Sequence, residues 1–379
     1  MYVLGIGRTQ FGVLDNSLLG LASEAILKSL KDCKLTINDI DAIYIGNFLG
    51  GILQNQLHLN SAVASFFPNT HIPIIRIETA CASGGVAFHQ ACLALSRYNR
   101  ILVLGVEKMT GYDGVLTSKA IASAGDVELD QSQGLGFPSS YALIARKYMS
   151  ESGATIDDLS KISFKAHHNA NKNELAHFFN KEVSYQKIKE SATVSSPLRL
   201  FDCSPISDGA AAVVISRERY SERDIEIIAS SLKTDSISLV QRKNITSFTA
   251  AKLAAEEAYS MAKITPDQVD IAEVHDCFTI SEMIAMEDLG FCKTGESKEW
   301  IRNGKTELEG SLPINTGGGL KANGHPIGAT GVSQICEIVT QLRGEAGNRQ
   351  VKNVKIGLTH NIGGVGGTAV IHILKNNNN

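Results

Sequence analysis

Residues 72–97, IPIIRIETACASGGVAFHQACLALSR, contain the turn from which the fold can be worked out. An apolar run, Ile72–Ile77, leads into a group of small residues around Cys81, and a stretch with helical spacing, Val86–Arg97, leads out of it. Short apolar runs suit strands that are covered on both faces, and apolar residues three or four positions apart suit a helix. The sequence therefore predicts a tight strand-to-helix turn that contains Cys81.

The same alternation of strand and helix patterns continues on both sides of this turn. Alternating strands and helices indicate an α/β fold built mainly on parallel sheet. The predicted strands cover residues 42–45, 101–106, 210–215, 225–228, 271–274 and 369–373. The clearest predicted helices cover residues 19–31, 250–263 and 331–343.

Two parts of the chain share a helix, a polar turn, an aspartate and a strand in the same order. Aligning Asp41 with Asp270 gives an offset of 270 − 41 = 229 residues. A repeat of this length indicates two related halves, although two generic helix–turn–strand units are the alternative. We expect an N-terminal half over 1–215 with a polar lobe inserted at about 113–200, a C-terminal half over 216–375 and a disordered tail over 376–379.

Composition and charge exclude several classes of protein. The 379 residues include 36 Lys and Arg against 39 Asp and Glu, a net charge of −3 that provides no basic surface for nucleic acid. No apolar run reaches the roughly 18 residues of a membrane span, and the first residues do not have the pattern of a signal peptide. Seven cysteines, an odd and scattered set, do not suggest a disulfide framework. We therefore expect a globular cytoplasmic protein with no nucleic acid partner and no membrane span.

Two segments place reactive side chains directly after predicted strands. Cys81 lies at the start of a predicted helix, where the helix dipole lowers the pKa of a thiol; a small buried core residue is the alternative. In the second segment, His275 and Cys277 lie two positions apart on extended chain and can face the same side. That spacing suits an acid/base pair or an oxyanion donor better than a metal site, because zinc normally takes a fuller set of ligands.

Two later segments are rich in glycine. The stretch NTGGGLKANGHPIGATG, residues 315–331, has neither a P-loop nor a dinucleotide-binding pattern. Its His325 stands between Gly324 and Pro326 before a predicted helix, where it suits a general base; a surface loop histidine is the alternative. The stretch HNIGGVGG, residues 360–367, can present bare backbone N–H groups to a substrate, or can simply turn between two strands.

In this order, the four segments resemble those of the thiolase superfamily of condensing enzymes. Cys81-Ala82-Ser83 resembles the nucleophile turn, and residues 275–278 (HDCF) and 324–326 (GHP) resemble boxes of the sterol-carrier-protein-2-type thiolases. Archaeal-type acetyl-CoA C-acyltransferases are similar as well. The similarity covers nearly the whole chain and includes residues 5–12, 205–212 and 341–347. It implies a five-layer αβαβα fold of two duplicated βαβαβαββ halves, with a loop domain inserted in the first.

The resemblance implies an acyl-CoA C-acyltransferase of lipid or fatty acid metabolism. Such an enzyme performs thiolytic cleavage of β-ketoacyl-CoA, the reverse Claisen condensation, or both. Coenzyme A thioesters are then the substrates, and no permanently bound cofactor or metal is expected. Cys81 would attack the thioester and carry the acyl group. His325 would take the proton of Cys81 and later help to hold the thioester oxygen, and His275 would supply an oxyanion donor.

One departure from the family pattern concerns the second catalytic cysteine. Most thiolases carry it in a late C-x-G box, and that box reads Asn361-Ile362-Gly363 in this chain. A base must still remove the α-proton of an acetyl thioester, so Cys277 is the first candidate and His275 the second. The amide of Gly363, together with that of Cys81, would form a second oxyanion hole.

The sequence indicates the coenzyme A contacts less clearly. His168 and Lys172, in the polar lobe, could meet phosphates, and Ser247 and Thr249, at the start of a predicted helix, could meet the pantetheine arm. A solvated polar surface is the alternative for His168 and Lys172. We expect a homodimer or homotetramer, as is usual for thiolases of this kind.

Two other functions remain open at this point. A ketoacyl synthase-like condensing enzyme shares the Cys-His-His set, but Pro326 after His325 and the box around Cys277 favour a thiolase. A non-catalytic thiolase-like protein that binds a lipid or a protein partner is the other function. The presence of Cys81, His275 and His325 argues against it.

Overall fold

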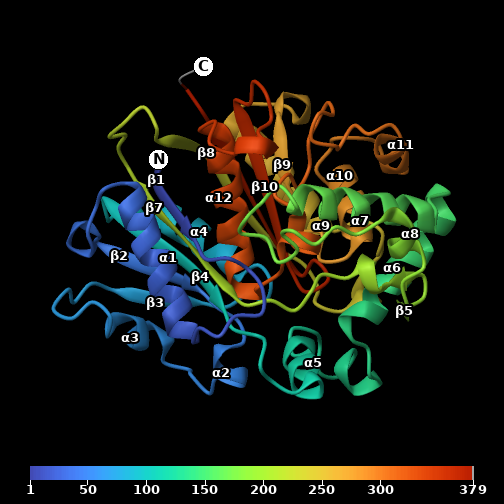
Figure 1. The fold of residues 1–379 in the computed structure, drawn as a ribbon, viewed down its shortest axis with the longest axis horizontal. Helices are drawn as coiled ribbons and strands as arrows, with labels where there is room; N and C mark the ends of the chain where they lie inside the picture. Colours follow the sequence, from blue (N-terminus) through green and yellow to red (C-terminus); the bar gives the residue numbers. More distant parts are fainter. Residues whose placement is uncertain (378–379) are drawn as a thin grey trace.

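The fold is built around a nine-stranded sheet with the strand order β3-β2-β4-β7-β1-β8-β11-β10-β9 (Figure 1). The computed structural model describes residues 1–377. All strands expected from the sequence are present, whereas β1 and β10, whose patterns are interrupted by glycine, were not predicted. The strands are β1 (Tyr2–Arg8), β2 (Ala42–Gly46), β3 (Ile74–Ile77), β4 (Arg100–Glu107), β7 (Gly209–Ser216), β8 (Ile225–Thr234), β9 (Ile271–Glu273), β10 (Ile356–Gly363) and β11 (Thr368–Lys375).

The sheet consists of two halves with the same internal strand order. From edge to centre, the first half runs β3-β2-β4-β7-β1. The second half runs β9-β10-β11-β8. A parallel β-bridge between Ala272 and Ile314 places one more segment beside β9, in the position that β3 has beside β2 in the first half. In the described part of the chain, β1 pairs with β8 only at Tyr2 and Val3. The two halves are therefore joined at the centre by a very short ladder.

Asp41 and Asp270, the aligned aspartates of the predicted repeat, make the same contacts in the two halves. Oδ2 of Asp41 accepts from two backbone N–H groups at the start of β4, at 2.8 and 2.9 Å. Oδ2 of Asp270 accepts from two backbone N–H groups at the start of β10, both at 2.8 Å. The sequence repeat thus preserves an aspartate that satisfies the free amides at a strand end.

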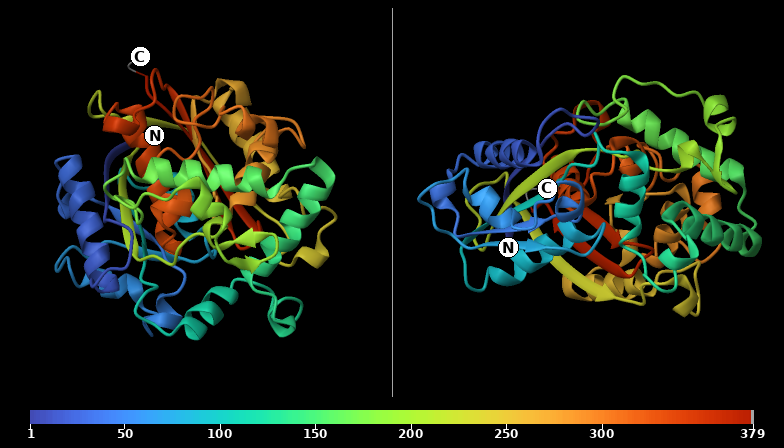
Figure 2. Two further views of the ribbon diagram at one scale, coloured as in Figure 1. Left: turned by 45° about the vertical axis from the view of Figure 1, so that its right-hand side comes forward. Right: turned by 90° about the horizontal axis from the view of Figure 1, so that it is seen from below.

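Helices cover the outer faces of both half-sheets and also lie between them, which gives the five layers αβαβα (Figure 1; Figure 2). On β4, Ile101 and Val103 pack with α4 and α12 between the halves, whereas Leu102 and Leu104 pack with α1 outside. Both faces of the strand are buried, as its continuous apolar run predicts. The predicted fold class is confirmed, but the expectation of a mainly parallel sheet is wrong: three neighbouring pairs, β2–β3, β2–β4 and β9–β10, are parallel, and the other five are antiparallel. These helices are α1 (Leu18–Asp32), α4 (Ser83–Ala94) and α12 (Thr330–Leu342), with α9 (Thr249–Ala262) and α10 (Thr279–Asp288) on the second half.

Most of the chain between β4 and β7 forms a lobe of helices with one short strand pair. In Figure 1 its helices α6, α7 and α8 gather on the same side as α10 and α11 (Ser297–Arg302). The lobe contains α5 (Gly114–Ala122), α6 (Phe137–Ser152), α7 (Ile156–Ala170), α8 (Tyr185–Lys189) and the two-stranded pair β5 (Thr193–Ser195) and β6 (Leu198–Arg199). Two short helices, α2 (Gly50–Leu53) and α3 (Leu59–Ala64), lie in the first half.

The C-terminal end of the described chain is anchored by Asn376. Its backbone N–H donates to Lys355 at 2.9 Å, and its side chain donates to the carbonyl of Leu342 at 2.6 Å. Residues 378 and 379, the second half of the tail predicted at 376–379, lie outside the described residues. The seven cysteines, all in the described part, are free thiols. Within residues 1–377, no helix is both long and apolar enough to cross a membrane.

Candidate active site

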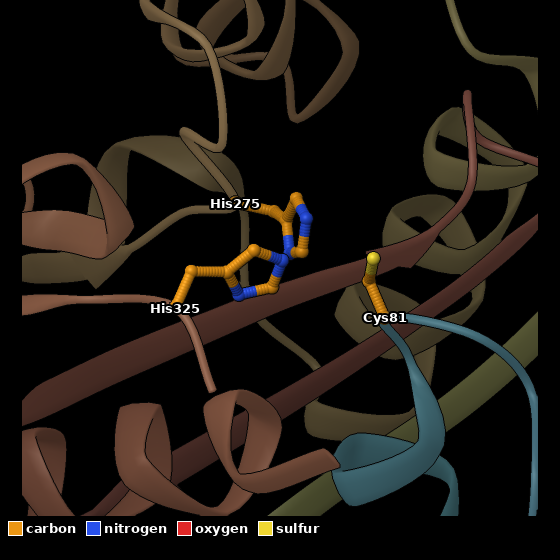
Figure 3. Close-up of side chains that lie close together, drawn as sticks. All are labelled: Cys81, His275 and His325. Atoms are coloured by element: carbon orange, nitrogen blue, oxygen red, sulfur yellow. The ribbon is translucent and has the colours of Figure 1, made fainter. Parts of the chain in front are cut away.

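Three side chains from distant parts of the chain meet at one buried point (Figure 3). The sulfur of Cys81 and one ring nitrogen each of His275 and His325 lie within 4.8 Å of one another. Cys81 lies on the β3–α4 turn, His275 directly after β9, and His325 just before α12. Their exposed fractions are 8%, 0% and 7%. A thiol beside two imidazoles in a nearly dry site forms a nucleophile with a base within reach.

The turn that contains Cys81 and the loop that contains His325 lie together because their backbones approach each other closely. A Cβ on Gly84, in the first turn of α4, would lie 2.6 Å from the carbonyl oxygen of Gly328, so that position requires glycine. The buried carboxylate of Glu107, at the end of β4, also accepts a hydrogen bond from the N–H of Gly328 at 3.0 Å. The glycine-rich segments thereby hold Cys81 and His325 at a fixed separation.

Burial controls the protonation of Cys81 more strongly than the helix dipole does. Burial raises the pKa of the thiol to about 12, and hydrogen bonds from its own amide and from that of Gly364 oppose this only in part. The expected lowering of the pKa by the helix N-terminus is therefore wrong for the resting site. The physical reason is that desolvation of the buried thiolate raises the pKa more than the hydrogen bonds of the two amides lower it. Cys81 is a thiol at rest and needs a base.

His325 presents Nε2 as that base. Its Nδ1 lies 2.7 Å from the hydroxyl of Thr330, and the same hydroxyl donates to the carbonyl of Pro326 at 3.0 Å. Because a hydroxyl has one hydrogen, Thr330 must accept from Nδ1–H of His325. Nε2 then keeps its lone pair. Burial lowers the pKa of His325 to about 3, so the ring is neutral at neutral pH.

Thr330→Val is expected to slow the alkylation of Cys81 by iodoacetamide about 10-fold or more, while the protein stays folded. The substitution keeps the shape of the side chain but leaves Nδ1–H of His325 without an acceptor, so the ring loses its fixed tautomer. Thr340→Val is the matched control, because Thr340 lies on the same helix and its hydroxyl donates to the carbonyl of Cys336 at 2.8 Å. Equal alkylation rates in the two variants would contradict the role of Thr330.

His275 presents its free ring edge as a hydrogen-bond donor. Its Nδ1 lies 3.0 Å from Nδ2 of Asn361, which also donates to the carbonyl of Cys81 at 3.0 Å. Oδ1 of Asn361 accepts from the N–H of Gly85 at 3.3 Å, which fixes the orientation of the amide. Nδ1 of His275 is therefore an acceptor, and the hydrogen lies on Nε2, which is buried without a hydrogen-bond partner among the described residues. A buried N–H kept free in this way suits an oxyanion.

Cys277 is buried close enough to Cys81 for the two thiols to affect each other's charge, and the hydroxyl of Ser281 lies beside its sulfur. Sγ is 4.0 Å from Oγ of Ser281, and the hydroxyl groups of Tyr141 and Ser281 both act to lower the pKa of Cys277. Burial raises the pKa of Cys277 far above its ordinary value, and the nearby Cys81 raises it further. Cys277 is therefore also a thiol at rest, and it becomes a base only after it has given up its proton.

The strand β10 ends in a turn that faces Cys81. Gly363 is the last residue of β10, and the amide of the next residue, Gly364, acts to lower the pKa of Cys81. Gly364 and Gly366 have φ angles of +61° and +87°, which favour glycine. Residues 360–367 are thus half strand and half turn, and Gly363, the residue predicted for the second oxyanion hole, directly precedes Gly364.

The four residues predicted to contact coenzyme A lie apart from this cluster. The hydroxyl of Ser247 donates to the carboxylate of Asp288. Thr249 is the exposed first residue of α9. His168 and Lys172 line a separate cavity of about 580 Å³ at the end of α7.

Three residues of the site were not predicted from the sequence. Asn361 was visible only as the residue that replaces a cysteine in the C-x-G box. Thr330 lies in the glycine-rich segment after His325, where nothing distinguishes its hydroxyl from that of any other threonine. Tyr141 lies in the polar lobe, far from every motif, and no sequence signal points to it.

Sequence models of one protein family match both halves of this chain. The model described as "Thiolase, N-terminal domain" matches residues 1–219, and that described as "Thiolase C-terminal domain-like" matches residues 231–376. Acetyl-CoA acetyltransferase of Methanothermobacter thermautotrophicus is 46% identical over 98% of each chain. Sterol carrier protein 2 of Homo sapiens is 32% identical, over 99% of this chain and 72% of that one. The solved structure of the Ltp2-ChsH2(DUF35) aldolase aligns with a TM-score of 0.85 and 25% identity, over 100% of this chain and 98% of that one.

Proposed function

Because the chain belongs to the thiolase family, we propose that it transfers acyl groups between coenzyme A thioesters through a covalent intermediate on Cys81. The enzyme is an acyltransferase of the acetyl-CoA C-acyltransferase type. Its reaction is the thiolytic cleavage of β-ketoacyl-CoA, the reverse Claisen condensation, or both. The observation that carries this proposal is the buried convergence of Cys81, His275 and His325 in a chain closely similar to an acetyl-CoA acetyltransferase.

In the first half of the reaction, Cys81 attacks the thioester carbonyl. Nε2 of His325 takes the proton of the thiol as the new C–S bond forms. The backbone amides of Cys81 and Gly363 form the oxyanion hole that stabilises the negative oxygen of the tetrahedral intermediate. The C–S bond to coenzyme A then breaks. Cys277 gives its proton to the leaving sulfur, so that coenzyme A departs as a thiol and Cys277 becomes a thiolate.

In the condensation, the thiolate of Cys277 removes an α-proton from a second acetyl thioester. The enolate oxygen is held by the Nε2–H groups of His275 and of the now protonated His325. The enolate carbon attacks the acyl carbonyl, the C–S bond to Cys81 breaks, and the sulfur recovers its proton from His325. Thiolysis follows the same steps in reverse.

Acetoacetyl-CoA with coenzyme A is the substrate pair that tests this function. We expect two acetyl-CoA per turnover, together with an acetylated peptide that contains Cys81 in a rapidly quenched digest analysed by mass spectrometry. Turnover only with malonyl-acyl-carrier substrates would favour the ketoacyl synthase alternative. Neither turnover nor an adduct would favour a non-catalytic binding protein and overturn the proposal.

The coenzyme A contacts stay part of the proposal. His168 and Lys172 are proposed to meet its phosphates, because the 580 Å³ cavity that they line also contains a second lysine and an exposed phenylalanine. Cations and an aromatic ring suit a nucleotide. Thr249 is the better candidate for the pantetheine arm, because the hydroxyl of Ser247 is already bonded to a carboxylate.

A homodimer is proposed from the free edge of the sheet. β3 is an edge strand, and Ile75 in its middle is 44% exposed. Exposed apolar edge strands tend to pair with another chain, so a second copy is the proposed partner, and light scattering in solution tests this.

A homotetramer, a cytoplasmic location and a role in lipid or fatty acid metabolism are proposed on the family resemblance alone. The division into halves at 215 and 216, with the lobe at about 113–200, is proposed as well.

A bound metal stays outside the proposal. Although Cys81, His275 and His325 converge closely enough to hold an ion, Nε2 of His275 carries a hydrogen. Only two free ligand atoms are left, fewer than zinc takes.

A further inference from the structure

The glycine turn after β10, residues 363–367, contacts the turn that contains Cys81. A Cβ on Gly363 would lie 2.5 Å from the carbonyl oxygen of Thr79, which precedes Cys81 by two residues. The proposed oxyanion hole needs the amide of Gly363 at one fixed place, because a donor that shifts stabilises the developing charge less. Four of the five residues of this turn are glycines, which give it little rigidity of its own. Its position must therefore come from other parts of the fold.

Three consecutive carbonyl groups of the turn accept hydrogen bonds. The carbonyl of Gly363 accepts from two N–H groups of the same turn, at 3.0 and 3.1 Å. The carbonyl of Gly364 accepts from the hydroxyl of Tyr141 at 3.0 Å, and the carbonyl of Val365 accepts from Nη1 of Arg242. Because a peptide group is planar and trans, a carbonyl that is held also fixes the direction of the N–H group that follows it. Two side chains from outside the turn thus hold its backbone.

Tyr141 is held rigidly where it meets the turn. It lies on α6, in the lobe, with an exposed fraction of 0%. Its ring stacks on Phe278, with the centroids 4.5 Å apart and 24° between the planes, and it meets Phe248 edge-on at 6.5 Å. Burial raises the pKa of Tyr141 well above its ordinary value, so the hydroxyl keeps the hydrogen that it donates.

Arg242 is held by the segment before α9. Its Nε donates to the carbonyl of Ser236 at 3.1 Å, and Cζ lies 6.0 Å from the centre of the Phe248 ring. A Cβ on Gly366 would lie 2.8 Å from that same ring. Phe248 is therefore a common support for the turn and for both of its outside donors, Tyr141 and Arg242.

We propose that Tyr141 and Arg242 are positioning residues that hold the amide of Gly363 in the oxyanion hole, through the carbonyls of Gly364 and Val365. The inference rests on the proposed function, because it requires acylation through a tetrahedral intermediate. Neither side chain touches the reacting atoms, and neither gains or loses a proton. Their contribution appears only as the carbonyl oxygen of the substrate becomes negative, so it should depend on which atom becomes negative.

Two reagents, p-nitrophenyl acetate and p-nitrophenyl thionoacetate, separate this role from a general loss of packing. Both acylate the thiol of Cys81 and release p-nitrophenolate, but the second places sulfur where the first places the oxyanion. Sulfur is a weak acceptor on a longer bond, so a hole shaped for oxygen helps the thionoester little. The ratio of the two acylation rates, measured by stopped flow, therefore reports the oxyanion hole.

Tyr141→Phe keeps the stacked ring and removes only the hydroxyl. We expect acylation by the ester to be about 10-fold slower and acylation by the thionoester to stay within about 2-fold of the wild type. The ratio of the two rates should thus fall about 10-fold, less than the loss of roughly 100-fold or more that follows removal of a hole donor itself. Arg242→Met, which keeps a long side chain and removes its donors, should lower the ratio in the same direction.

Tyr148→Phe and Arg217→Met are the matched controls. Tyr148 is a second buried tyrosine on α6, but its hydroxyl bonds to Glu287 and Ser297 and not to the turn. Arg217 also donates to a backbone carbonyl, that of Leu95, in the first half of the fold. Both controls should keep the wild-type ratio.

The outcomes distinguish this inference from the proposed function. An unchanged ratio in either Tyr141→Phe or Arg242→Met overturns the inference, even if both rates fall, because a loss of packing alone slows the two reagents alike. A wild-type ratio equal to that of free N-acetylcysteine would mean that no oxyanion hole acts, and it would overturn the inference together with the proposed mechanism. The proposed function fails on its own evidence if acetyl-CoA leaves no acyl group on Cys81 of the wild type.

Discussion

Replacing Cys81 by alanine is expected to slow thiolysis of acetoacetyl-CoA by about 10⁴-fold or more and to abolish the acyl adduct. The variant loses the atom that carries the acyl group, and no neighbour can take its place. Cys277 is another thiol near Cys81, but burial holds its pKa still further above the ordinary value. Initial rates and intact-protein mass spectrometry measure the two losses.

Cys92→Ala is the control for this substitution. Cys92 lies on α4, the helix that follows the nucleophile turn, and it is buried with a pKa that burial raises to about 12, as for Cys81. Its sulfur packs in the core between the halves and away from the histidines. The control should keep both turnover and adduct. An acyl adduct that survives in Cys81→Ala would place the nucleophile elsewhere and contradict the mechanism.

Particular glycines explain why some strands could be predicted from the sequence and others could not. Strands with continuous apolar runs, such as β4, were predictable because both of their faces are buried. β1 and β10 were missed because glycines break their runs. In the structure, a Cβ on Gly7 would lie 2.3 Å from the backbone nitrogen of Ser29, and one on Gly357 would lie 2.4 Å from Ile338. These glycines let α1 and α12 pack close to the strands. A sequence alone does not distinguish a glycine that allows such close packing from one that marks a turn.

The members of the site were predictable, but their protonation was not. Short motifs identify Cys81, His275 and His325 because each motif is local. The tautomers depend on Thr330 and Asn361, and the contact of Asn361 with Cys81 spans 280 residues of chain. The pKa of Cys81 depends on how deeply the whole fold buries it, which a helix start alone does not show.

His325→Asn is expected to slow the acylation of Cys81 about 10³- to 10⁴-fold at pH 7. In the wild type, burial lowers the pKa of His325 to about 3, so the base is present above about pH 4 and is lost only as the pH falls through about 3. Without this base, attack requires a thiolate formed by solvent. With a pKa of about 12 for Cys81, the thiolate fraction at pH 8 is about 10⁻⁴. Asparagine can still donate to Thr330, so the loop keeps its anchor.

The rate of the variant should therefore rise about tenfold per pH unit between pH 7 and 9, in step with the thiolate of Cys81, while the wild type stays nearly constant. Stopped-flow acylation by p-nitrophenyl acetate measures both profiles. His372→Asn is the control, because burial lowers the pKa of His372 to about 3 as well, and its ring nitrogens contact Ser230 and the carbonyl of Gly85. It should give the flat wild-type profile. A flat profile in His325→Asn would mean that another group takes the proton of Cys81, and it would overturn the role of His325 as the base.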